Sequence, residues 1–149
     1  MSDVRRTALH AAFQATGYVV RAHPLVGDRK HVLRVGAEHP ALDAALTARG
    51  FATWAFLTAW NRHAHPRPPR TNARLQQRLV ALLEAKGHAA LSAVGVADDR
   101  RWFEESLFVP GLSRDEALRI GGLFDQEAVL WGAVSGVAEL VMCSGSVRT

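Results

Sequence analysis

The stretch FATWAFLTAW, residues 51–60, decides the fold. Its aromatic and aliphatic side chains fill successive positions, so both faces that a strand would present are apolar. A strand with one face in water alternates apolar with polar residues, whereas a run of this kind indicates a strand near the centre of a sheet, covered on both sides. The remaining segments must therefore provide neighbouring strands and cover for both faces.

The segments before this strand predict a helix, a hairpin and a second helix. Apolar residues recur at helical spacing over residues 3–16, and two apolar runs, residues 18–22 and 31–37, then bracket a turn. Residues 39–50 form a short helical pattern with Pro40 in its first turn, where proline is well tolerated. The chain therefore reaches the central strand from a helix.

After the central strand, the sequence predicts a helix, a hairpin, another helix and a final hairpin, over residues 71–87, 88–96 with 101–109, 113–124, and 128–134 with 137–143. Thr71 or Asn72 is the expected N-cap of the first of these helices, since both side chains can accept a backbone hydrogen bond. Ser113 and Glu116 have the spacing of a capping box at the start of the second.

This order mixes hairpins with crossovers, which favours an α+β fold over a strictly alternating α/β fold. We expect a single mixed or mostly antiparallel sheet with helices packed on it. No internal repeat, low-complexity tract or long linker interrupts the sequence. Residues 1–149 are therefore predicted to form a single globular α+β domain.

Composition points to a soluble protein of the cytoplasm. The 149 residues are 48% apolar and 21% charged, as is typical of globular proteins. No segment approaches the roughly 20 apolar residues of a membrane helix, and the N-terminus lacks the pattern of a secretory signal. A single cysteine, Cys143, excludes an internal disulfide. We expect no membrane association, and no pattern predicts an oligomeric state.

The basic residues are of an unusual kind, because 16 of the 18 are arginine and the net charge is +4. Arginine binds phosphates and carboxylates bidentately and stacks on bases, so this arginine-rich composition is compatible with a nucleotide or nucleic-acid partner. A high genomic GC content also raises arginine over lysine, and this alternative stays open.

A basic stretch, TAWNRHAHPRPPRTN at residues 58–72, joins the central strand to the next helix. Free backbone N–H groups at a helix N-terminus attract anions, so the junction is a candidate anion site. Asn61 offers a donor and an acceptor, and Trp60 offers a stacking face. The cations that would complete the site are Arg62, Arg67, Arg70 and Arg74. The alternative is a solvated connector.

Neither a metal nor a cofactor is expected. His63 and His65 form an H-x-H pair, but a catalytic zinc site takes three protein ligands and the other histidines show no partner motif. The glycine-rich fingerprints of nucleotide-binding loops do not occur in the sequence.

A second polar cluster lies in the stretch WFEES, residues 102–106. Strand alternation places Glu104 and Ser106 on one face and Glu105 on the other, so one glutamate must point toward a covered face. If that residue is Glu104, its carboxyl is either a general acid/base with a raised pKa or half of a structural ion pair with an arginine. Gln126, at a helix-to-strand junction, either binds a ligand or caps loose backbone groups.

Aromatic residues alternate with apolar neighbours in several predicted strands, which indicates core packing and not a stacking platform for nucleic acid. The residues interpreted in this way are Trp54, Phe56, Trp102, Phe103, Phe108 and Trp131.

The motifs FLTAWN, WFEESLFVPGL and GLFDQEAVLW resemble a bacterial family known as domain of unknown function 3293. The likeness spans residues 51–131 and implies a small bacterial protein. The polar positions that match the family pattern are Thr58, Trp60, Asn61, Asn72, Glu104, Ser106 and Gln126.

The favoured function is a binding module for an anionic ligand, a nucleotide or a nucleic acid, at residues 61–74. Two other classes stay open, and so does the question of catalysis. One is a small enzyme with Glu104 as general acid/base and Asn61 and Gln126 positioning the substrate. The other is an interaction domain whose basic loop binds an acidic protein partner. Each site hypothesis expects Asn61, Asn72, Glu104 and Gln126 to converge on one cleft.

Overall fold

The structure is a computed structural model that describes residues 3–61 and 65–143. Within these residues, four helices surround one seven-stranded sheet. The helices are α1 (Asp3–Gln14), α2 (Pro40–Ala48), α3 (Pro69–Ala85) and α4 (Arg114–Leu123). The strands are β1 (Thr16–Val20), β2 (His31–Leu33), β3 (Thr53–Leu57), β4 (Leu91–Ala97), β5 (Phe103–Pro110), β6 (Ala128–Ala133) and β7 (Glu139–Met142).

The sheet has the strand order β2-β1-β4-β5-β3-β6-β7, and each of these neighbouring pairs is antiparallel. Strand β3, predicted to lie inside the sheet, is hydrogen-bonded to β5 on one side and to β6 on the other. Its side chains from Trp54 to Leu57 are buried on both faces. The predicted α+β class and the interior position of this strand are both confirmed.

The sheet curls until segments next to its two edge strands meet. The N–H of Gly36, just after β2, donates to the carbonyl oxygen of Ala138, just before β7, over 2.8 Å. The N–H of Ala138 donates in turn to the carbonyl oxygen of Ala37 over 2.9 Å. Across the curl, the rings of Tyr18 and Phe56 meet edge to face with centroids 5.1 Å apart, although two strands separate β1 from β3 in the sheet. The sheet therefore encloses an interior, much as a barrel does.

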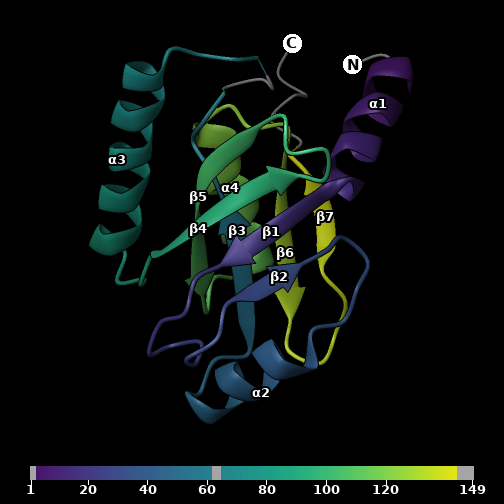
Figure 1. Ribbon diagram of the computed structural model, residues 1–149. Helices are drawn as coiled ribbons and strands as arrows, with labels where there is room; N and C mark the ends of the chain where they lie inside the picture. The colour runs from purple at the N-terminus through teal and green to yellow at the C-terminus, as the bar shows by residue number, and fades with distance from the viewer. Residues whose placement is uncertain (1–2, 62–64, 144–149) are drawn as a thin grey trace.

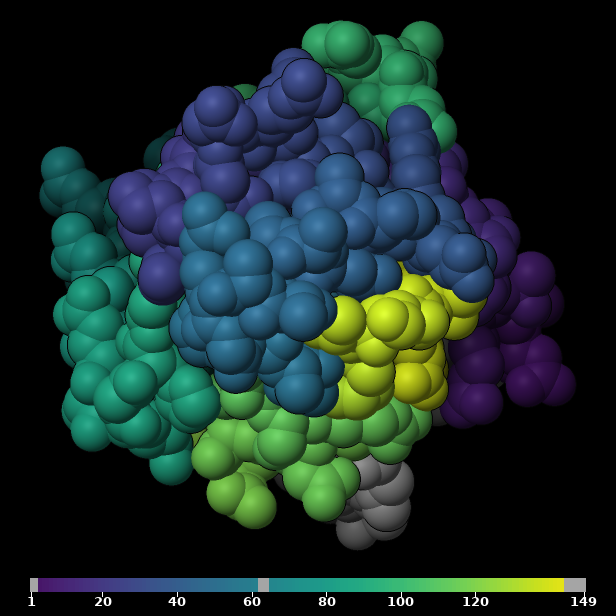
Figure 2. Space-filling model, turned by 90° about the horizontal axis from the view of Figure 1, so that it is seen from below, coloured from purple at the N-terminus to yellow at the C-terminus, as the bar shows by residue number. Residues whose placement is uncertain are grey.

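The inner face of the sheet is the face turned toward this interior. Its buried side chains include Tyr18, Val20, Trp54, Phe56 and Phe108. Helix α2 closes one end, because its Leu42 and Leu46 belong to the same cluster. This end is the lower one in Figure 1, and Figure 2 shows α2 beside the turn between β6 and β7. Helix α1 lies near the opposite end (Figure 1).

The outer face of the sheet is covered by α3 and α4. Leu79 and Leu83 of α3 and Ile120 of α4 pack on outward-facing residues such as Ala55 and Val109. Burial of a large aliphatic side chain of this kind contributes about 1.5–3 kcal/mol relative to its exposure. Leucines along one side of this helix therefore dock it on the sheet.

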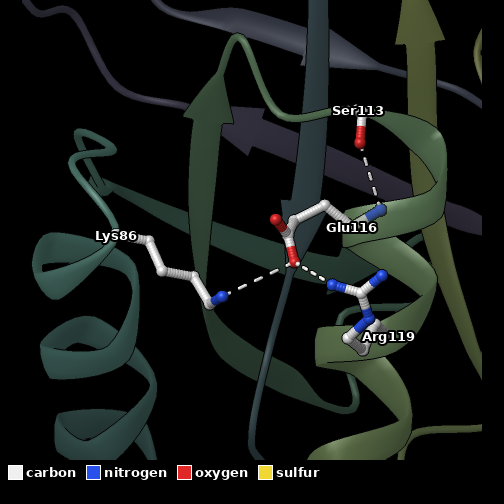
Figure 3. Close-up of polar contacts among 4 residues, drawn as sticks. All are labelled: Lys86, Ser113, Glu116 and Arg119. Atoms are coloured by element: carbon white, nitrogen blue, oxygen red, sulfur yellow. Dashed lines mark hydrogen bonds and ion pairs between the residues drawn. The ribbon is translucent and has the colours of Figure 1, made fainter.

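The N-terminus of α4 carries the serine half of the predicted capping box. The hydroxyl oxygen of Ser113 accepts a hydrogen bond from the N–H of Glu116 over 3.1 Å. The Glu116 carboxylate turns toward two cations, with its Oε2 3.1 Å from Nη1 of Arg119 and 3.8 Å from Nζ of Lys86 (Figure 3). Because Lys86 follows α3, this carboxylate connects α3 to α4 outside the sheet.

Each of the predicted strands is present, although the second is shorter than expected: β2 ends at Leu33, whereas the prediction extended to residue 37. The apolar residues beyond Leu33 leave the strand to form the contact that joins the two ends of the sheet. Among the described residues, no helix is both long and apolar enough to cross a membrane.

Candidate functional site

Asn61 is the point at which the polar residues predicted from sequence meet. It follows β3 and has a φ of 53°, a left-handed conformation that asparagine adopts more readily than most residues. Its backbone N–H donates to Oδ1 of Asn72 over 2.9 Å, and Nδ2 of Asn72 donates back to Oδ1 of Asn61 over 3.0 Å. Its own Nδ2 donates to Oε2 of Glu104 over 2.9 Å. Asn61, Asn72 and Glu104 therefore form one connected network.

Gln126 joins the same region from the other side. Its Nε2 donates to the carbonyl oxygen of Trp60 over 3.0 Å and to that of Phe124 over 3.4 Å. The amide therefore satisfies backbone carbonyls, as the capping alternative expected, and also fixes the residue before Asn61. Each of the four residues expected to converge takes part in holding this loop.

Thr58 and Gln76 hold the start of the loop. The Thr58 hydroxyl donates to the carbonyl oxygen of Glu105 over 2.7 Å and accepts from the N–H of Trp60 over 3.0 Å. Gln76, on α3, accepts from the N–H of Ala59 over 2.8 Å and donates to the same Glu105 carbonyl over 3.1 Å. Gln76 was not predicted from the sequence. The feature that could have indicated it is its position directly after Leu75, where a polar side chain follows an apolar residue of the packed side of α3.

Glu104 points toward the interior of the sheet from β5. Burial raises the pKa of its carboxyl group, and the hydrogen bond from Asn61 partly opposes this shift because it favours the charged form. Ser106, beside it on the same face, donates its hydroxyl hydrogen to the backbone carbonyl of Glu104 over 3.1 Å. Among the described residues no cation lies within ion-pair distance of Glu104, so the structural ion pair expected with an arginine is not found there. The expected ligand residue Arg62 lies outside the described residues.

A cavity of about 360 Å³ opens at the end of the interior beside α1, in front of Glu104. The lining includes Thr58, Asn61, Ser106 and Gln126 together with Glu104, so most of the predicted polar residues face one space. Asn72 is only 3% exposed and lies behind Asn61, where it positions that residue without lining the cavity. The remaining wall is mainly apolar and includes Phe13, Tyr18, Phe56, Trp102 and Leu130.

Tyr18 and Gly95 shape the cavity, and sequence reasoning missed both. They align with Glu104 across three neighbouring strands, since Tyr18 pairs with Gly95 and Gly95 pairs with Glu104. Burial, followed by the nearby charge of Glu104, raises the pKa of Tyr18, whose hydroxyl donates to the carbonyl oxygen of Phe13 over 3.2 Å. The available signal was a glycine inside an apolar strand, which often marks a close approach by another group.

Trp102 and Phe103 correct the prediction that the aromatic residues of the strands are core. Trp102 is 42% exposed and lines the cavity, and Phe103 is 55% exposed. Trp102 directly precedes β5 and Phe103 is its first residue, both just after the turn at Arg100. The ring of Phe103 lies 5.9 Å from that of Trp60, which was expected to offer its face to a ligand and instead contacts this side chain.

The described arginines of the predicted anion site lie apart from the cavity. Arg67, Arg70 and Arg74 are exposed, and none of them lines it. The predicted cap of α3 is wrong: the helix begins at Pro69 with Pro68 as N-cap and no side-chain cap, because proline is pre-set for the first helical position. Asn72 then lies within the first turn and uses its side chain on Asn61. Since Pro68 and Pro69 carry no N–H group, this helix start offers an anion fewer donors than expected.

The comparisons with known proteins indicate a family. No curated protein and no solved structure matches the chain. The sequence model of the family described as Protein of unknown function (DUF3293) matches residues 57–129. This match begins just before Thr58 and ends just after Gln126, so it includes the loop network and the central part of the site. Residues 57–129 of the chain belong to the DUF3293 family.

Proposed function

We propose that the protein is a small-molecule binding module whose ligand lies in the cavity, with an apolar body inside the curled sheet and a polar end at Glu104. The observation that carries this proposal is a cavity of about 360 Å³ with an apolar wall and a partly buried carboxyl group. Ligand sites are typically concave and mainly apolar, of about 300–1,000 Å³, with a few convergent polar groups that fix orientation.

The hydrogen-bond network supports a preorganised site. Asn61 fixes Oε2 of Glu104, and Asn72 fixes Asn61. A side chain held by such a second layer loses little conformational freedom when a ligand binds, which favours affinity. Glu104 is therefore the proposed ligand-contacting group, and Asn61 and Asn72 are positioning residues.

A cavity-filling variant tests the proposal. A Cβ atom added at Gly95 would lie 3.8 Å from the nearest atoms of Thr16 and Tyr18, so Gly95→Leu would fit at its root and project toward the cavity. The control is Gly122→Leu, because a Cβ atom added at Gly122 meets nothing within 4 Å. We expect neutral and charged phenylalkyl probes to raise the melting temperature of the wild type and of Gly122→Leu, but not of Gly95→Leu. Equal stabilisation of both variants, or of none of the proteins, would overturn the cavity as the binding site.

Glu104 also suits a catalytic role in the same cavity, the enzyme alternative. A carboxyl group with a raised pKa keeps a proton at a higher pH and serves as a general acid/base when a substrate lies in reach. Turnover of a bound probe that is lost in Glu104→Gln, while binding persists, would support this role. Turnover that is unchanged in that variant would exclude it.

A second candidate function concerns the arginine face of α3, which we define as Arg70, Arg74 and Arg78 on the helix together with Arg67 just before it. The three on the helix follow at intervals of four residues and are exposed, and none forms an ion pair with a described residue. Side chains at this spacing share one side of a helix, with a rise of about 6 Å from one to the next. We propose this face for anionic ligands, a nucleotide or a nucleic acid.

Binding of single-stranded RNA at several salt concentrations tests the arginine face. The double variant Arg70→Gln/Arg74→Gln should weaken binding and reduce the salt slope by about 1.4, as expected from about 0.7 for each single-strand phosphate contact. The control Arg6→Gln/Arg29→Gln removes the same charge from exposed positions outside α3. An equal loss of RNA affinity in both double variants would show that the net charge, and not the arginine face, determines binding. Capture of an acidic protein by the wild type but not by Arg70→Gln/Arg74→Gln would indicate a protein partner instead.

We propose the cytoplasm as the location of this binding. The single cysteine of the sequence supports this proposal, since proteins of oxidising compartments commonly carry cysteines that pair as disulfides. Cell fractionation is the direct test.

A further inference from the structure

We infer that the ligand of the cavity is an organic amine in its cationic form, whose ammonium group binds Glu104 and whose apolar part lies against the aromatic wall. This inference rests on the proposed function and specifies its ligand class. It is carried by the charge of the lining, by the direction of its hydrogen-bond donors and by the aromatic groups around the carboxylate.

The charge of the described lining is acidic. Among the described lining residues, the charged ones are Glu104 and Glu127, and none is lysine, arginine or histidine. Oε1 of Glu127 has a cation nearby, Nη2 of Arg5 at 3.7 Å. Glu104 has no such cation among the described residues, so a cationic ligand would supply the missing charge. A carboxylate or phosphate ligand would instead meet a like charge in a partly desolvated space.

The hydroxyl groups of the described lining are already committed as donors within the protein. The hydroxyl groups of Tyr18, Thr58 and Ser106 each donate to a backbone carbonyl oxygen. The amide of Gln126 likewise donates to two carbonyl oxygens. These side chains therefore present mainly acceptor capacity to the cavity.

The carboxyl group of Glu104 presents a free acceptor as well. Its Oε2 accepts from Asn61, while no described residue donates to Oε1. Among the described residues, every buried side-chain oxygen or nitrogen atom has a hydrogen-bond partner. Because Oε1 has no such partner, it is not one of these buried atoms and is accessible from the cavity. An ammonium group, with three donors and a positive charge, complements an accessible carboxylate oxygen surrounded by acceptors.

The aromatic wall suits both parts of such a ligand. Tyr18 and Phe56 contact each other edge to face on the inner face, and Trp102 lines the cavity from just before β5. The negative faces of aromatic rings attract ammonium groups within about 6 Å, and their area covers an apolar chain. Gly95 leaves the space between Tyr18 and Glu104 in which the cation would lie.

Three probes of similar shape separate the ligand classes: 2-phenylethylamine, 2-phenylethanol and 3-phenylpropionate. Calorimetric titration of the wild type at neutral pH should give the amine at least about tenfold tighter binding than the alcohol, as expected for a charge-assisted hydrogen bond. The propionate should bind most weakly. Alcohol or propionate binding as tight as that of the amine would overturn the inference while leaving the cavity as a binding site.

Glu104→Gln provides the second measurement, because it keeps the shape and the acceptor for Asn61 but removes the charge. The amine should lose its advantage over the alcohol in this variant, whereas the affinity for the alcohol should stay within about twofold. An amine preference that persists would assign the cation to another group and overturn the inference. Absence of binding by all three probes to the wild type would instead count against the proposed function itself.

Discussion

The side-chain amide of Asn61 donates to Oε2 of Glu104 over 2.9 Å and so joins the loop after β3 to the inner face of β5. The same asparagine holds a left-handed backbone conformation, and Asn72 on α3 satisfies its N–H. The conformation of one loop residue is therefore coupled to the protonation of a partly buried carboxyl group. Two different substitutions at Asn61 can separate the contribution of the backbone from that of the amide.

Asn61→Ala and Asn61→Gly should both raise the pKa of Glu104 further, because each removes the hydrogen bond that favours the charged carboxylate. The carboxyl carbon of Glu104, followed by NMR during a pH titration, reports this change. Asn61→Ala should also be less stable than Asn61→Gly by about 1 kcal/mol, since only glycine adopts a φ of 53° without strain. An unaltered Glu104 titration in both variants would contradict the proposed coupling.

Asn72→Ala should lower the free energy of unfolding by about 1–3 kcal/mol, because it leaves the N–H of Asn61 without its partner in a partly buried loop and removes one of the two hydrogen bonds that Oδ1 of Asn61 accepts. Thr71→Ala is the matched control. It changes the neighbouring residue, which the sequence proposed equally as a helix cap but which makes no capping bond here, and should cost less than about 0.5 kcal/mol. Urea denaturation measures both values. A larger loss for Thr71→Ala would restore the capping role to that residue.

The fold could be predicted from sequence because local patterns determine it. The middle of the apolar stretch at residues 51–60 forms the interior strand β3 (Thr53–Leu57), and Ser113 caps α4 as its spacing indicated. Hydrophobic periodicity and capping chemistry act over a few residues, so both are readable without a structure. The hairpins β1–β2, β4–β5 and β6–β7 followed from the same local signals.

The cavity could not be predicted in this way, because it depends on the curl of the sheet. The contact between residues near Gly36 and Ala138 joins segments about one hundred positions apart, and no local pattern indicates it. The same limit applies to Tyr18, whose alignment with Glu104 passes through Gly95 on a third strand. Polar residues could be proposed as a group from their types and positions, but their distances required the register of the strands.

Gly132→Ala and Gly95→Ala should differ sharply in stability although the chemical change is the same. A Cβ atom at Gly132 would lie 2.5 Å from Cζ2 of the buried Trp54, so overpacking should destabilise this variant by about 1–3 kcal/mol. A Cβ atom at Gly95 meets its neighbours at 3.8 Å, an ordinary contact, and alanine restricts the unfolded chain. Gly95→Ala should therefore match the wild type or exceed it by up to about 1 kcal/mol. Thermal unfolding of the pair checks the order, and the opposite order would show that the cavity beside Gly95 is already filled.

Glu104→Gln should change how stability depends on pH. Burial raises the folded-state pKa of Glu104 above its unfolded value, so the folded protein holds this proton more tightly than the unfolded chain. The resulting stabilisation is fully present below the unfolded pKa and is lost as the pH rises through the folded pKa. Glutamine stays neutral and can still accept from Asn61, so the variant should lose less stability than the wild type over this window. Urea unfolding at a series of pH values measures the difference.

Glu105→Gln, on the opposite face of β5, is the control for the loss of one carboxyl group and should retain the wild-type dependence of stability on pH. Parallel curves for the wild type and Glu104→Gln would show that Glu104 has the same proton affinity in the folded and unfolded states.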